Sequence, residues 1–350
     1  MRRSTALILI FIVVFVVGIP VYLGTLGWIR ITGPYRGYLG TEQFVDIPPG
    51  TSTAEIGHKL ADAGVIPDRF TFRVAVWWTQ AGSRLKAGEY RFDRALTPLA
   101  VIERLERGDV FTRRVTFPEG LTVAEMAALY QARGLGTAAE FQAAASDATA
   151  IRELDPDARD LEGYLFPDTY ALTRSASASV LVSMMVERFK TAYDQALGHR
   201  AEEQTLSLRE IVTLASLVEK ETASDDERPV VSAVYRNRLR IGMAMQADPT
   251  VVYALAKARR YKGNITRDDL NINSPYNTYR YAGFPPGPIA SPGLAALSAA
   301  LAPADVPYLY FVSRNDGTHV FARTLAEHNA NVRKFQVEFF RNSRRGRARG

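Results

Sequence analysis

PPGTSTAEI at residues 48–56 and PEGLTVAEM at residues 118–126 are two versions of one pattern, and they decide how the middle of this chain is interpreted. In both, a hydroxyl residue is followed three positions later by a glutamate. This spacing is a capping box, in which the two side chains satisfy the first N–H groups of a helix. The pairs are Ser52 with Glu55 and Thr122 with Glu125.

A short predicted strand precedes each predicted helix, at residues 44–47 and 113–117. A glycine two positions before each cap permits the turn out of a strand. Each copy therefore predicts strand, turn and helix, a small α/β module used twice. Chance similarity between two common capping sequences is the alternative. A further strand is expected at residues 88–92, so residues 40–135 are predicted to form small mixed modules.

Toward the N-terminus the chain has no charged residue between Arg3 and Arg30. The most apolar part, residues 6–26, would cross roughly 30 Å of hydrocarbon as a helix. Arg2 and Arg3 precede it, and positive charge favours the cytoplasmic side. We therefore expect one transmembrane anchor with the N-terminus inside and the rest of the chain outside. A cleaved signal peptide is the alternative, although the apolar stretch is long and no A-x-A-like site follows.

Composition narrows the classes of function. Charged residues make up 23% of the 350 residues and apolar ones 47%, as in globular proteins. The absence of cysteine excludes disulfides, thiolate zinc sites and a cysteine nucleophile, and the four histidines form no H-E-x-x-H pattern. We expect no metal and no cofactor. The net charge of +6 owes much to the tail at 341–350, which in an extracytoplasmic protein favours anionic lipid or wall polymer over nucleic acid as partner.

Residues 208–222 predict a helix that ends near two carboxylates. On a helical wheel, Glu219 and Glu221 lie about 200° apart, at opposite edges of one apolar arc. A glutamate at the border of a buried face can have a raised pKa suited to general acid chemistry. A solvated charged face is the alternative, and the wheel does not choose between the two acids.

Aromatic and proline-rich segments follow a pattern that suits a carbohydrate cleft, because rings stack on sugars and amides bind their rims. Ordered structural turns would have the same composition. The segments are LEGYLFPDTY at 161–170, QADPTVVY at 246–253, SPYNTY at 274–279 and GFPPGPI at 283–289.

Taken together, six motifs resemble the endolytic murein transglycosylases of the YceG/MltG-like family, over nearly the whole chain. They are EGYLFPDTY at 162–170, ASLVEKET at 215–222, NRL at 237–239, DPT at 248–250, YNTY at 276–279 and PPGPI at 285–289. The resemblance implies a single-pass inner-membrane protein with a LysM-like N-terminal part and a periplasmic lytic domain. That domain would cut peptidoglycan strands internally, leave 1,6-anhydro-N-acetylmuramoyl ends, and work beside the synthases that elongate the strands.

The resemblance also assigns the acid. The family's catalytic glutamate falls on Glu221, followed by Thr222 as a serine follows the acid in related enzymes, and Glu219 is the second choice. One carboxyl group is enough for this chemistry. A muramidase would need a second carboxylate, for which Asp248 or Glu162 are candidates. A non-catalytic wall-binding scaffold for a synthase is the remaining alternative. The expected substrate contacts are Thr222, Glu162, Tyr164, Asp168, Gln246, Asp248, Thr250, Tyr276, Asn277 and Tyr279.

The predicted fold class is α+β. We expect a leader and anchor at 1–30, LysM-like modules at 31–135, a connecting segment at 136–160, a catalytic domain at 161–340 and a basic tail at 341–350.

Overall fold

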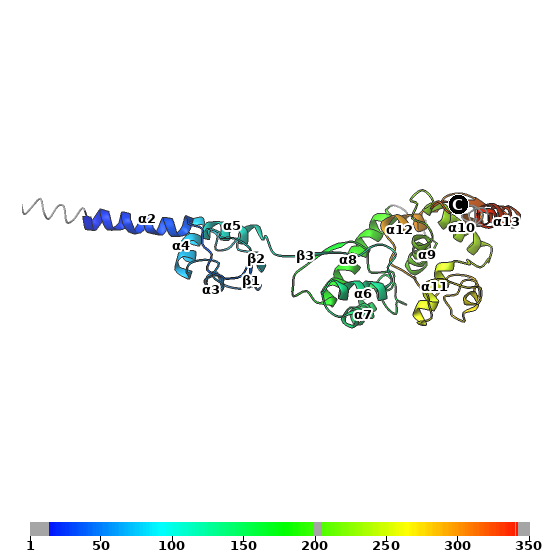
Figure 1. Cartoon of the computed structure of the whole chain (residues 1–350), viewed down its shortest axis with the longest axis horizontal. Helices are drawn as coiled ribbons and strands as arrows, with labels where there is room; N and C mark the ends of the chain where they lie inside the picture. Colours follow the sequence, from blue (N-terminus) through cyan, green and yellow to red (C-terminus); the bar gives the residue numbers. More distant parts are fainter. Residues whose placement is uncertain (1–13, 199–204, 340, 342–350) are drawn as a thin grey trace, which may run out of the picture. The chain divides into compact units, whose positions relative to one another are not determined.

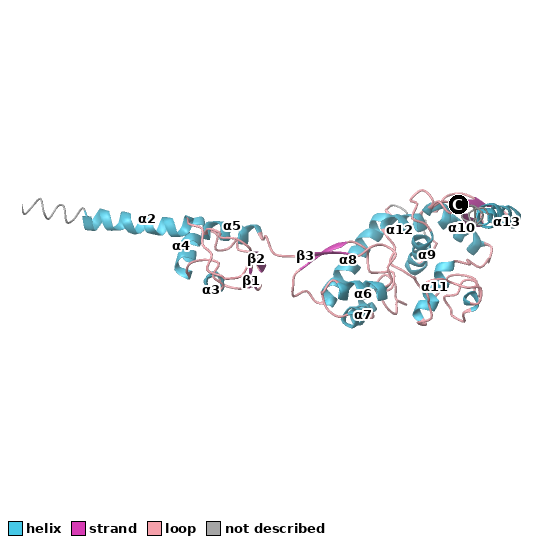
Figure 2. Ribbon diagram, viewed as in Figure 1, coloured by secondary structure: helices cyan, strands magenta, loops and turns pink. Residues whose placement is uncertain are grey.

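The structure, a computed structural model, describes residues 14–198, 205–339 and 341 and divides into two compact units (Figure 1). The first unit is Met1–Arg113 and the second is Arg114–Gly350. The basic leader and nearly all of the basic tail that the sequence suggested lie outside the described residues. Both units contain helices and short strands, so the fold is mixed α/β, with helices in the majority (Figure 2).

The described part of the first unit begins with an apolar helix, a π-helical turn η1 (Val14–Gly18) followed by α2 (Ile19–Thr32). The window Phe15–Thr32 has a mean hydropathy of 1.4 and only 6% of it is buried, so its length and composition fit a membrane span. The helix ends six residues after the most apolar part and two residues after the predicted end of the anchor at residue 30. Its last turn enters the folded part of the unit, because Ile31 is buried in the core there.

The rest of the first unit is two antiparallel strands with three helices. These are β1 (Gln43–Ile47), α3 (Thr53–Asp62), α4 (Arg69–Thr79), β2 (Gly88–Phe92) and α5 (Pro98–Arg107). In the sheet Val45 pairs with Tyr90, and both side chains are buried. Ser52 caps α3 by accepting the Glu55 N–H, so the strand, turn and helix predicted at this point are confirmed.

The second unit is mainly helical. Its elements are β3 (Arg113–Thr116), α6 (Val123–Ala132), α7 (Ala138–Ala145), η2 (Ala148–Ile151), β4 (Thr169–Leu172), α8 (Ala178–Leu197), α9 (Leu208–Glu221), α10 (Arg228–Arg240), α11 (Asp248–Lys257), η4 (Asp269–Asn271), α12 (Leu294–Leu301), β5 (Tyr310–Ser313), β6 (His319–Ala322), α13 (Leu325–Val332) and η5 (Arg333–Glu338). Among the described residues β3 pairs with β4, and β5 pairs antiparallel with β6.

The second copy of the sequence pattern has the predicted local structure but a different place in the protein. Gly120 turns the chain with φ of +75°, and Thr122 with Glu125 forms a complete capping box on α6. The preceding strand β3 pairs with β4, and α6 packs against α7. Since those partners belong to the second unit, the division falls at Arg113 and not at the predicted residue 135.

Helix α9 is the centre of the second unit. A capping box of Ser207 and Glu210 starts it, and every residue from Ile211 to Val218 is buried. It packs against α10, α11 and α12. A helix buried on all sides cannot tilt or slide without breaking many contacts. Its C-terminal residues, the two candidate acids included, are therefore held in fixed places.

Candidate active site

Glu221 is the last residue of α9. The next residue, Thr222, is extended with φ of −141°, so the chain turns away and leaves the Glu221 carboxylate at the helix end. The Tyr235 hydroxyl on α10 donates a hydrogen bond to Glu221 Oε2 at 3.3 Å. Tyr235 is buried, whereas Glu221 is partly exposed. The acid is thus held from inside the protein and remains open to a ligand.

The surroundings of Glu221 favour its protonated form. Burial and, to a smaller extent, the negative charge of Asp248 together raise the pKa of Glu221 to about 7. His319, the Tyr235 hydrogen bond and Arg238 act in the opposite direction and are outweighed. At neutral pH the carboxyl group is therefore divided between its acidic and basic forms, which suits a group that must donate and accept a proton.

Glu219 has different partners, as the helical wheel predicted. Its Oε2 accepts the N–H of Gly293 at 3.1 Å, and Gly293 is the N-cap of α12. Its Oε1 lies 3.7 Å from the Arg228 guanidinium, and both side chains are only 8% exposed. Burial raises the pKa of Glu219 too, against the effect of the Gly293 N–H. Both oxygens are engaged by the protein, so Glu219 joins α9 to α10 and α12.

Thr222 lies beside the acid but does not face solvent. Its hydroxyl donates to Glu227 Oε2 at 3.3 Å and accepts the Ser224 N–H at 3.1 Å. Glu227 in turn binds His319, with 2.7 Å to Nδ1 and 2.8 Å to the backbone N–H. Burial alone would raise the pKa of Glu227, but these hydrogen bonds from His319 lower it. Thr222 therefore helps to hold the His319 ring near the acid.

Two loops bring a second carboxylate toward Glu221. The Tyr279 hydroxyl donates to Asp248 Oδ1 at 2.6 Å, and Asp248 is exposed at the start of α11. The preceding Gln246 is exposed and has φ of +53°, a left-handed conformation that a non-glycine residue adopts rarely. All three residues are at least partly accessible to a ligand, and the charge of Glu221 acts on both Asp248 and Tyr279.

Thr250 and Asn277 hold these loops from within. The hydroxyls of Thr250 and Thr278 lie 2.9 Å apart, and both residues are buried. The Asn277 amide donates to the carbonyls of Leu270 and Ile272, each at 2.9 Å. Their polar atoms are satisfied by the protein, so the structure places them as supports of the loops.

A second group of predicted residues gathers around Glu162. Its Oε1 accepts the Val123 N–H at 3.0 Å and its Oε2 accepts the Tyr253 hydroxyl at 3.2 Å. Burial raises the pKa of Glu162 to about 7. The rings of Tyr253 and Tyr276 lie 4.8 Å apart, and Lys257 approaches both.

Two cavities of about 440 and 470 Å³ meet at this group, since Glu162 and Lys257 line both. Helix α11 carries Asp248 near Glu221 and Tyr253 beside Glu162, about 8 Å apart along the helix axis. One rigid helix therefore connects the acid with a hollow surface that has aromatic rings and a carboxyl group.

The remaining two predicted contacts are engaged elsewhere. The Tyr164 hydroxyl is buried and donates to Asp155 Oδ2 at 2.5 Å, although its ring lines the larger cavity. Asp168 forms an ion pair with Arg188 at 2.8 Å. Neither contacts Glu221 in any hydrogen bond of the described residues.

Sequence reasoning missed Tyr235 and Glu227. Nothing in the local pattern marks Tyr235, because it meets Glu221 only through the packing of α10 on α9. Glu227 is one of several acids after α9 and gains its role from His319, which lies 92 positions later. Among the described residues, no group of three or more histidine, aspartate or glutamate side chains is arranged to hold a metal ion.

Comparison with known proteins places this geometry in context. The model of the YceG-like family matches residues 45–334. An endolytic murein transglycosylase of Bacillus subtilis (strain 168) is 32% identical over 307 residues, which cover 83% of this chain and 84% of the relative. One from Streptococcus pneumoniae serotype 2 is 30% identical over 321 residues, covering 82% of this chain and 57% of the relative. The crystal structure of a yceG-like protein from Listeria monocytogenes is 30% identical, with a TM-score of 0.55 over 83% of this chain and 98% of that one.

Proposed function

Because this chain belongs to the YceG-like family, we propose that Glu221 is the acid and base with which it cleaves glycan strands as an endolytic murein transglycosylase. The relatives from Bacillus subtilis and Streptococcus pneumoniae carry that name, and the match to the first covers most of both chains. The observation that carries the residue assignment is the environment of Glu221, a partly exposed carboxyl group whose pKa burial raises to about 7.

The proposed reaction uses this one group twice. Protonated Glu221 donates its proton to the glycosidic oxygen while the bond from that oxygen to C1 of the muramoyl residue breaks. The Glu221 carboxylate then removes the proton of the muramoyl C6 hydroxyl as that oxygen bonds to C1. Glu221 is protonated again at the end, no water is consumed, and the new end of the strand is a 1,6-anhydro ring.

Neighbouring groups support each half of the cycle. The charge of Asp248 favours the protonated form of Glu221 before cleavage and would stabilise positive charge that develops at C1. The Tyr235 hydroxyl donates to Glu221 Oε2 and so stabilises the carboxylate that exists between the two proton transfers. Tyr235 thereby also fixes the direction in which the carboxyl group points.

Glu219 is not the proposed acid, because its two oxygens are committed to Gly293 and Arg228. A scaffold without catalysis would have no need of a carboxyl group with a raised pKa and no ion-pair partner at the end of α9, which is what Glu221 is among the described residues. Glu219 thus has the partners of a structural glutamate, a backbone N–H and an arginine, whereas Glu221 accepts one hydrogen bond from the Tyr235 hydroxyl.

A muramidase is the second candidate, favoured by one observation. Asp248 acts on Glu221 strongly enough to raise its pKa, so a second carboxylate is present near the acid. Hydrolysis adds water across the bond, whereas the transglycosylase reaction does not. Digestion of purified peptidoglycan in ¹⁸O-labelled water separates them by mass. We expect anhydro ends without label, and labelled reducing ends would establish the hydrolase.

We propose the location and partners from the same family membership. The apolar helix containing α2 would anchor the chain in the inner membrane with the N-terminus in the cytoplasm and both folded units outside. Synthases that elongate the strands would be the working partners. The first unit, ordered β1, α3, α4, β2, would be the LysM-like part.

A further inference from the structure

Helix α4 in the first unit has one buried face and one face of aromatic and basic residues. Phe72 and Val76 are buried in the core of the unit. On the opposite face, Phe70 and Trp77 are 63% and 75% exposed, with exposed Arg73 between them at the spacing of successive helical turns. The Arg73 guanidinium lies 5.6 Å from the centre of the Phe70 ring. Large aromatic side chains rarely face water without a partner.

This face is continuous with the end of the apolar helix α2. The rings of Trp28 and Trp78 meet edge to face, with 6.0 Å between their centres. At the other end of α4, the carboxylate of its N-cap Asp68 lies 4.0 Å from the Arg30 guanidinium. Both ends of α4 therefore contact the last turns of α2, and α4 lies across the end of that helix (Figure 1).

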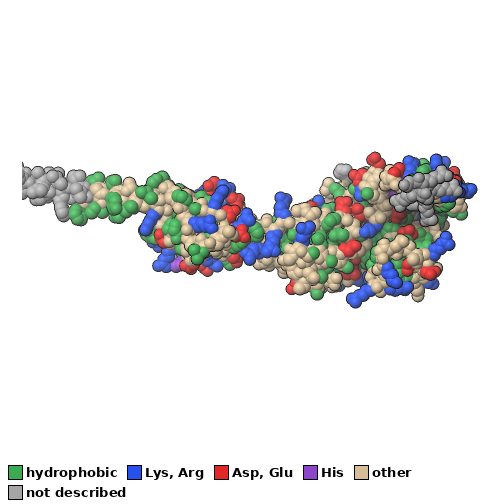
Figure 3. Space-filling view, in the orientation of Figure 1, with side chains coloured by type: hydrophobic (Ala, Val, Ile, Leu, Met, Phe, Trp, Pro, Cys, Tyr) green, Lys and Arg blue, Asp and Glu red, His purple; other side chains and the backbone are tan. Residues whose placement is uncertain are grey.

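The contact with α2 sets the depth of α4 relative to a bilayer. Along α2 no charged side chain appears before Arg30, which is visible as a stretch without red or blue in the space-filling view (Figure 3). Trp28 stands at this transition, where tryptophan is enriched in membrane proteins. Since Trp78 touches Trp28, it lies at the same level. Ile31 is buried in the core of the unit, so no flexible linker separates the span from α4.

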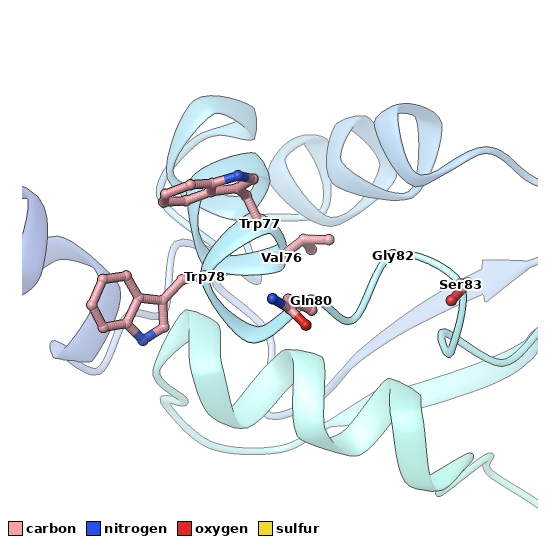
Figure 4. A pocket seen from close by; sticks show the side chains of 6 residues that line it. All are labelled: Val76, Trp77, Trp78, Gln80, Gly82 and Ser83. Atoms are coloured by element: carbon pink, nitrogen blue, oxygen red, sulfur yellow. The ribbon is translucent and has the colours of Figure 1, made fainter.

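The three tryptophans of the chain, Trp28, Trp77 and Trp78, all belong to this region. Trp77 and Trp78 project from the last turn of α4 and border a hollow of about 610 Å³, with Gln80 on the loop that follows (Figure 4). Trp78 is 62% exposed even with Trp28 against it.

We propose that the exposed face of α4, formed by Phe70, Arg73, Trp77 and Trp78, binds the outer surface of the phospholipid bilayer in which α2 is anchored. The two indoles and the phenyl ring lie among the headgroups and upper acyl chains, and Arg73 pairs with anionic headgroups. The first unit is then fixed against the membrane by two contacts, the span and α4. The proposal rests on the proposed anchoring of α2.

A glycan surface would also use tryptophan rings, and it is the occupant that the test must separate. Lipid is favoured because Trp78 is held by the end of the apolar helix itself, and because basic residues flank the rings on α4. The face carries no acid apart from Asp68, which caps the helix by accepting the Thr71 N–H at 2.8 Å. That arrangement matches an anionic lipid surface in both charge and position.

The test uses the full chain in vesicles of phosphatidylcholine and phosphatidylglycerol, with the native tryptophans as probes. The variant W28F leaves Trp77 and Trp78 as the only tryptophans, and the double variant W77F/W78F leaves Trp28 alone. Each is measured with lipids brominated near the headgroup or near the bilayer centre, because bromine quenches an indole that it touches. Flotation of the vesicles at alkaline pH reports separately whether the chain is anchored.

In W28F we expect the fluorescence of Trp77 and Trp78 to be quenched most by bromines near the headgroup. In W77F/W78F we expect the fluorescence of Trp28 to be quenched as well. Quenching of Trp28 alone would overturn the proposal while leaving the anchor intact. Absence of quenching in both variants, with no flotation, would overturn the anchor and the proposal together. A fluorescence change of W28F with soluble peptidoglycan fragments and none with brominated lipid would show a glycan surface instead. If W28F does not fold, the unaltered chain is used, and quenching of its tryptophan fluorescence by aqueous iodide is compared between detergent and vesicles. Weaker iodide quenching in vesicles supports the proposal, and equal quenching contradicts it.

Discussion

Replacing Glu221 with glutamine should stabilise the second unit at alkaline pH, although it removes the proposed acid. The pKa of Glu221 in the folded chain is about 7, against an ordinary value of 4.5 that applies to the unfolded chain. Between these pH values the unfolded chain has released the proton and the folded chain has kept it. The free energy of unfolding therefore falls as pH rises from about 4.5 to 7, and above that it stays lower by about 3 kcal/mol.

Glutamine has the same shape, stays neutral at every pH and still accepts the Tyr235 hydrogen bond. Glu221→Gln should therefore match the unaltered chain at pH 4.5 and exceed its stability by about 3 kcal/mol at pH 8. For a unit of this size, that difference corresponds to a rise in Tm of roughly 6–12 °C. Both tryptophans of α4 and Trp28 lie in the first unit, so fluorescence follows that unit and circular dichroism follows both. The fluorescence transition should be unaffected by the substitution.

Glu219→Gln is the matched control on the same helix. It removes the charge that faces buried Arg228, so it should lower the stability of the second unit at pH 8. If Glu221→Gln is less stable than the unaltered chain at pH 8, or if its advantage does not grow with pH, then Glu221 is not a destabilised acid and the reasoning fails.

Further predictions concern the neighbours of the acid and the topology. The cleavage rate should decline as pH rises through about 7, because Glu221 must begin protonated. Asp248→Asn removes a negative charge that raises the pKa of Glu221. This variant should therefore show the decline at lower pH and still give anhydro product. An inactive but folded Asp248→Asn would favour a two-carboxylate hydrolase. Asn277→Ala should lower the stability of the second unit by about 2 kcal/mol, since one buried and one partly buried carbonyl lose their donor. An unchanged Tm with lost cleavage would instead indicate substrate contact. A reporter fused after Gly350 should be active only outside the cytoplasm, and activity inside would contradict the proposed orientation.

Local features of the fold could be predicted because their causes lie within a few residues. The helix start at Val123 follows from a complete capping box and the one at Thr53 from the Ser52 N-cap alone, and in both the donor and acceptor are three positions apart. The partner of the strand before each helix could not be predicted. β1 pairs with β2 and β3 pairs with β4, and these choices depend on which core each strand enters. The two similar modules were thus separated by packing that the sequence pattern does not contain.

The candidate site divides in the same way. The wheel placed Glu219 and Glu221 on opposite edges of α9, which the structure confirms. Which of the two carboxylates is paired by the protein depends on distant residues. Glu219 is paired by Gly293, 74 positions later, and by Arg228 from the next helix. The loops around Asp248 and Tyr279 were expected to face a ligand together. Thr250 and Asn277 were expected there too, yet a composition rich in hydroxyl and amide groups does not reveal which of those groups point inward.

The most direct test of the central claim is digestion of purified peptidoglycan by Glu221→Gln and Glu219→Gln side by side, with products identified by mass and both proteins shown to be folded. The account predicts no 1,6-anhydro-N-acetylmuramoyl ends from Glu221→Gln and continued release of them by Glu219→Gln. Anhydro ends from Glu221→Gln, or their loss only in Glu219→Gln, would contradict it.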